Sequence, residues 1–102
     1  MSVSPESRRL VSDLIHAAYA RNRAAPSTPT NEVESLIGDV VVAKSKLVER
    51  ARRLGGSSVQ ALYLATGLSL SGSLAGSGRL RYEREALEWL ETLEAQQRER
   101  AA

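Results

Sequence analysis

The sequence predicts a mainly α-helical (α+β) domain, with four helices and one small β-hairpin before the last helix. Apolar residues recur at intervals of three and four along most of the chain, prolines and glycines interrupt them, and the pattern changes to alternation within 68–82. A length of 102 residues fits a single domain spanning 1–102. Residues 1–56 form a two-helix N-terminal half with a Pro-rich connection at 24–30, and residues 57–102 form a helix–hairpin–helix half.

The first helix is predicted from Pro5 to Asn22. Ser4 can accept hydrogen bonds from the free N–H groups of the first turn, and Pro5 suits the first helical position. Glu6 is favourable at the positive end of the helix dipole. One apolar stripe follows, made of Leu10, Val11, Leu14, Ile15, Ala18 and Tyr19.

The second helix is predicted from a capping pair, Asn31 with Glu34, to about Leu54, and a glycine pair then ends it. It should pack against the first and last helices. Its apolar residues cover more than one narrow stripe, so some of its sides are expected to lie against another subunit. The expected oligomer or partner interface consists of Val33, Leu36, Ile37, Val40, Val41, Leu47 and Val48.

A short third helix is predicted to begin at Ser57, which forms a capping signal with Gln60, and to close at Gly67. Leucines and serines then alternate over 68–74, a glycine-rich turn occupies 75–78, and alternation returns over 79–82. This pattern predicts the β-hairpin, with an irregular Gly/Ser loop as the alternative.

The helical period returns from Glu83 onward, and the polar tail after Gln96 is expected to fray. The apolar face of this last helix consists of Ala86, Leu87, Trp89, Leu90 and Leu93. Its opposite face is expected to be solvated and carries Glu83, Glu85, Glu88, Glu91 and Glu94.

Residues that could carry chemistry are scarce. The chain has no cysteine, which excludes disulfides, thiolate metal sites and a thiol nucleophile. His16 is the single histidine, and Asp13 on the same face is its nearest candidate partner. We therefore expect no catalytic, cofactor-binding or metal-binding residues, no cofactor and no small-molecule substrate. Neither a signal peptide nor a membrane-spanning run is recognisable in the sequence.

Cations gather in the second half of the second helix. Lys44, Lys46, Arg50 and Arg53 are possible phosphate contacts, which would suit a small nucleic-acid-binding regulator or a DNA-packaging accessory. The alternative is that cations favour a helix C-terminus and keep a long helix solvated. A net charge of +2 is small for a nucleic-acid-binding chain.

Residues 59–100 contain the run Ala-Leu-Tyr-Leu-Ala-Thr-Gly at 61–67, the predicted hairpin, and Ala-Leu-Glu-Trp-Leu-Glu-Thr-Leu-Glu at 86–94. These features resemble the gpW-like head–tail joining (head completion) proteins of long-tailed phages, which are helix–hairpin–helix domains. The resemblance implies a homo-oligomeric ring-forming connector, with other particle proteins as partners, duplex DNA in a channel, and a place in the virion or host cytoplasm.

The chain departs from that family in its two additional N-terminal helices and its Ser-rich hairpin. A partner-binding adaptor or inhibitor is a further alternative. Nothing in the sequence singles this alternative out.

Overall fold

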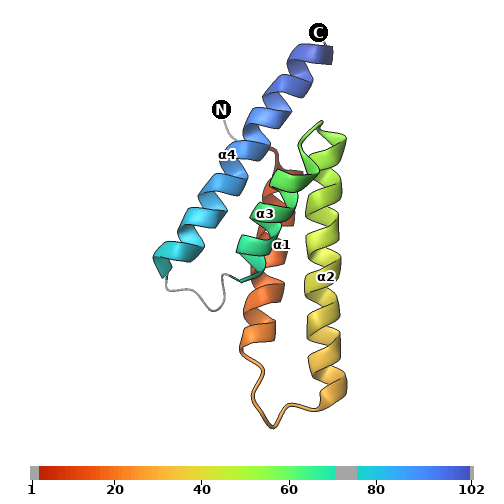
Figure 1. Cartoon of the computed structure of the whole chain (residues 1–102), viewed down its shortest axis with the longest axis vertical. Helices are drawn as coiled ribbons and strands as arrows, with labels where there is room; N and C mark the ends of the chain where they lie inside the picture. Colours follow the sequence, from red (N-terminus) through yellow and green to blue (C-terminus); the bar gives the residue numbers. More distant parts are fainter. Residues whose placement is uncertain (1–2, 71–75, 102) are drawn as a thin grey trace.

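The computed structural model describes residues 3–70 and 76–101, which form four helices in an elongated bundle measuring 54 × 26 × 23 Å (Figure 1). The helices are α1 (Pro5–Asn22), α2 (Thr30–Arg53), α3 (Ser58–Ser69) and α4 (Gly76–Ala101). Successive helices run in opposite directions along the bundle, so that short connections suffice between them. The predicted bounds of the first helix are confirmed.

The packing places α1 and α3 between α2 and α4. α2 packs chiefly against α1 and α3, whereas α4 packs against α3 and α1. In Figure 1, α2 and α4 form the two flanks. The predicted packing of the second helix on the first is confirmed, but its second main partner is α3 and not the last helix, because the apolar α3 fills the space between the flanks.

The core is aliphatic, as the composition requires of a chain without Phe. Leu14 comes from α1, Leu64 and Leu68 from α3, and Leu90 from α4, and all four are almost fully buried. Trp89 and Tyr82 are partly buried and pack against this core. Close packing of these leucines at the centre of the bundle supplies the main stabilising term.

The predicted β-hairpin is wrong, because the described residues contain no strand. Leu68 belongs to α3, and Tyr82 belongs to α4, which begins at Gly76. Residues 71–75, where the hairpin's first strand would end and its turn begin, lie outside the described residues. The predicted four-helix count is confirmed, while the α+β class is corrected to all-α for the described part of the chain.

The packing around Gly67 explains why the third helix does not end there, as the sequence had predicted. A Cβ on Gly67 would lie 2.3 Å from the Tyr82 ring, so the glycine is where α4 approaches α3 and not where α3 ends. The buried positions Ala61, Leu64 and Leu68 keep one helical period through Gly67. Leu68 and Ser69, where the alternation of leucine and serine begins, therefore belong to α3.

Helix ends follow the local signals at three of four tested places. Ser4 accepts from the Ser7 N–H and Ser57 from the Gln60 N–H, which confirms both caps. Gly55 has a φ of +85° and ends α2 as predicted. The Asn31 cap is wrong, since the N-cap of α2 is Pro29, two residues earlier, and no side chain caps the helix.

The polar tail is helical as well, because α4 continues to Ala101. Arg100 donates to the Leu54 carbonyl at 3.3 Å, which ties the end of α4 to the turn after α2.

Candidate functional site

Apolar side chains lie exposed along the adjacent sides of α2 and α3. Val41 and Val48 of α2 and Leu62 of α3 line a groove between the two helices. Val41 is 57% exposed and Leu62 is 50% exposed. Ile37 lies one turn before Val41 and Val59 one turn before Leu62, and both are exposed too. These five residues are called the α2–α3 surface below.

The α3 helix is apolar on both of its faces. Ala61, Leu64, Ala65 and Leu68 fill the core, yet the opposite face exposes Val59, Leu62, Tyr63 and Leu70. A helix that is hydrophobic all round is normally covered on all sides. The Tyr63 ring on this face meets Tyr82 of α4 edge-on, with centroids 6.0 Å apart.

The residues predicted for an interface are divided between core and surface. Val40 and Leu47 are buried in the chain's own core. Ile37 and Val41 are exposed. The remaining three are partly buried, namely Val33, Leu36 and Val48. Val59 and Leu62 of α3 are exposed apolar residues that were not among those predicted, although residues 59–70 lack a polar face in the sequence.

The possible phosphate contacts are likewise separated. Lys44 lines the α2–α3 groove, whereas Lys46 and Arg53 line a depression between α1 and α2 that also contains Glu6. Arg53 lies 3.9 Å from Glu6. Arg50 turns inward and is only 17% exposed. The four cations therefore do not share one open face.

Glu94 corrects the prediction of a solvated acidic face, because it is buried between α4, α1 and α2 with 5% exposure. Its carboxylate accepts hydrogen bonds from Ser4 N at 2.8 Å, Ser4 Oγ at 2.5 Å and Ser7 Oγ at 2.6 Å. Arg50 Nη2 donates to the same carboxylate at 3.1 Å. Arg50 Nη1 also lies 3.2 Å from Glu6.

Burial by itself would raise the pKa of Glu94, but the hydrogen bonds from Ser4, Ser7 and Arg50 outweigh it and lower the pKa to about 2. The carboxylate is therefore charged at neutral pH and holds its donors in place. No buried side-chain nitrogen or oxygen of the described residues lacks a hydrogen-bond partner. A cluster satisfied in this way joins three helices and stabilises their packing.

The signal for this cluster was present in the spacing. Ser7 lies four residues before Val11, Arg50 three residues after Leu47, and Glu94 four residues after Leu90. Each polar residue extends a buried apolar stripe by one helical step. Such a position places the side chain at the edge of the core.

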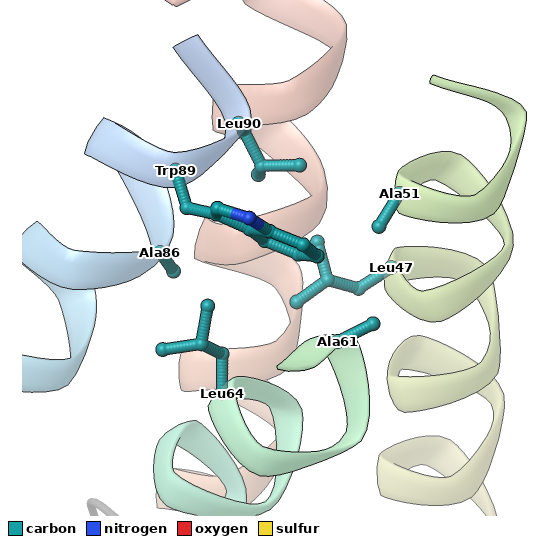
Figure 2. Close-up of a pocket in the computed structure, with 7 residues that line it drawn as sticks. All are labelled: Leu47, Ala51, Ala61, Leu64, Ala86, Trp89 and Leu90. Atoms are coloured by element: carbon teal, nitrogen blue, oxygen red, sulfur yellow. The ribbon is translucent and has the colours of Figure 1, made fainter. Parts of the chain in front are cut away.

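A small internal space lies beside Trp89. Figure 2 shows the indole lying between Leu90 and Ala86 of α4, Leu64 and Ala61 of α3, and Leu47 and Ala51 of α2. The free volume is about 10 Å³, no more than a single water requires. This space is a packing gap of an aliphatic core and has no room for an organic ligand.

His16 is exposed on α1, and Asp13 lies 4.0 Å from Arg9. Within residues 3–70 and 76–101, no three His, Cys, Asp or Glu side chains gather as a set that could hold a metal ion. Over the same ranges, none of the helices combines the length and the apolar character that crossing a bilayer requires.

Neither a protein-family model, nor a curated protein, nor a solved structure matches this chain.

Proposed function

We propose that the chain is a non-catalytic assembly module that binds further copies of itself through the α2–α3 surface. The observation that supports this proposal most directly is the outer face of α3. Val59, Leu62 and Tyr63 are all about half exposed or more, on a helix whose other face is already in the core. Covering such side chains removes apolar area from water, which is the dominant favourable term in protein association.

The exposed apolar residues form one continuous groove and are not scattered over the surface, which favours a role in binding. Val41, Val48 and Leu62 belong to two helices but line one groove. Contiguous apolar patches of this kind, bordered by polar residues, mark interaction sites on proteins of this size. Burying one aliphatic side chain fully contributes about 1.5–3 kcal/mol, so a few of them suffice for a specific contact.

A ring-forming connector at the head–tail junction of a phage-like particle is the specific form of this proposal that the resemblance of residues 59–100 implies. The hairpin no longer supports that form, which now rests on the sequence runs of α3 and α4 alone. Assembly through the α2–α3 surface does not depend on it.

The test compares two neighbouring valines of α2. Val41 lines the groove, whereas Val42 is similarly exposed at 53% but points about 100° away around the helix. We expect the wild type to be oligomeric by light scattering and native mass spectrometry. Val41→Asp should be monomeric with unchanged helicity by circular dichroism, and Val42→Asp should assemble like the wild type.

Leu62→Asp provides an independent check from α3 and should also give a folded monomer. A wild-type protein that stays monomeric at the highest attainable concentration would refute the proposal. Equal behaviour of the Val41 and Val42 variants would refute the assignment to this surface.

A further inference from the structure

The α2–α3 surface has a charged border. Lys44 and Arg52 line the same groove as Val41 and Leu62, with Glu49 as the only acidic residue of that lining. Arg52 lies 4.0 Å from Glu49, and both side chains are well exposed, so this ion pair contributes little. Any surface that covers the groove must therefore accommodate an excess of positive charge.

The outer face of α4 has the opposite character. Glu88, Glu91 and Glu99 line a shallow depression together with Thr92, Ala95 and Gln96. No cation is among these lining residues. Thr92, Ala95 and Gln96 lie between Glu88 and Glu99 along the helix, so uncharged residues separate the two acidic ends of this face.

The charged residues extend over comparable lengths of the two helices. Glu88 and Glu99 are eleven residues apart on one helix, which is about 16 Å, and Lys44 and Arg52 are eight residues apart, which is about 12 Å. Long Lys, Arg and Glu side chains bridge the difference. Val48 lies between Lys44 and Arg52 along α2, as Ala95 lies between Glu88 and Glu99 along α4.

The fold prevents these surfaces from meeting within one chain. α2 and α4 lie on opposite flanks, with α1 and α3 between them (Figure 1). Glu88 and Glu99 point away from the core, since Ala86, Leu90 and Leu93 of α4 are buried on the other side. The exposed Glu88 and Glu99 of one chain are thus accessible to the basic border of another.

We propose that the α2–α3 surface of one copy binds the acidic outer face of α4 in the next copy, in a head-to-tail arrangement. This inference rests on the assembly function proposed above and identifies the surface that covers the groove. A two-fold arrangement would place each basic border against itself, which like-charge repulsion disfavours. A head-to-tail contact leaves a free surface at each end, so it produces a closed ring or a filament.

Charge reversal on each side tests the arrangement. Protein A carries Lys44→Glu with Arg52→Glu, and protein B carries Glu88→Lys with Glu99→Lys. Each protein alone should be monomeric, because its dissociation constant for self-association is raised more than about tenfold. An equimolar mixture of A and B should assemble again, because every A–B contact pairs opposite charges.

A matched control reverses two cations elsewhere. Arg8 and Arg9 lie exposed on α1, away from the groove and from α4's acidic lining, so Arg8→Glu with Arg9→Glu should assemble like the wild type. Circular dichroism and thermal unfolding confirm that every variant is folded before its mass is measured.

The outcomes separate the two proposals. If protein B assembles like the wild type while Val41→Asp is monomeric, the assembly function stands and the head-to-tail arrangement is overturned. If A and B are both monomeric but do not assemble when mixed, the arrangement is also overturned. A monomeric wild type overturns the assembly function itself.

Discussion

Arg50 of α2 donates to the Glu94 carboxylate of α4 at 3.1 Å, at the point where both helices meet the start of α1. Ser4, which caps α1, and Ser7 of α1 also donate hydrogen bonds to that carboxylate. The cluster fixes the relative position of the two flanking helices, which otherwise have few direct contacts. In a head-to-tail assembly these flanks carry the two binding surfaces, so the cluster sets the angle between successive copies.

Glu94→Gln should destabilise the chain by about 2–3 kcal/mol, because it leaves the Arg50 guanidinium partly buried without its closest carboxylate. Urea unfolding followed by circular dichroism measures this. Glu88→Gln, on the exposed face of the same helix, is the control and should change the free energy of unfolding by less than about 0.5 kcal/mol. Equal effects of the two substitutions would contradict the structural role of Glu94.

Stability should fall as the pH drops from 4.5 to 2. The pKa of Glu94 is lowered from 4.5 to about 2 by folding, so the unfolded chain binds the proton first. The stabilisation from the charged carboxylate is fully present above pH 4.5 and amounts to roughly 3 kcal/mol at 1.36 kcal/mol per pKa unit. The free energies of unfolding of the wild type and of Glu94→Gln, measured at several pH values, isolate this contribution of the carboxylate. The same pH dependence in both proteins would show that Glu94 has an ordinary pKa.

Gly67→Ala should destabilise by about 1–3 kcal/mol, because the added methyl group would overlap the Tyr82 ring. Gly38 of α2 is the matched control, since a Cβ there meets nothing within 4 Å. Gly38→Ala should stabilise the chain by about 0.5–1 kcal/mol through helix propensity alone. Thermal unfolding of both variants gives the comparison. Stabilisation by both would mean that α4 does not pack closely on Gly67.

Residues 79–82 should give the chemical shifts of a helix. Cα secondary shifts are positive in helices and negative in strands, and α4 begins at Gly76. The same sign is expected for Leu68 and Ser69 at the end of α3. NMR on isotopically labelled protein measures these shifts. Negative values on both sides of 71–75 would indicate strands and would contradict the helical assignment.

Much of the fold could be predicted where the signals are local. Ser4 and Ser57 cap the residues that directly follow them, and Gly55 ends α2 through its own backbone angle. The period of the apolar residues located all four helices. These features depend on neighbours within one or two turns, so the amino-acid sequence by itself determines them.

Tertiary structure decided the features that depend on distant partners. Gly67 resembles a helix terminator until Tyr82 packs on it, and Glu94 resembles a surface carboxylate until Ser4, ninety residues away, donates to it. The surplus apolar surface was assigned to α2, but it lies on α3 as well, because only the packing shows which side of each helix the core covers. Periodicity shows that a face is apolar; the physical contact of other helices determines whether that face is buried.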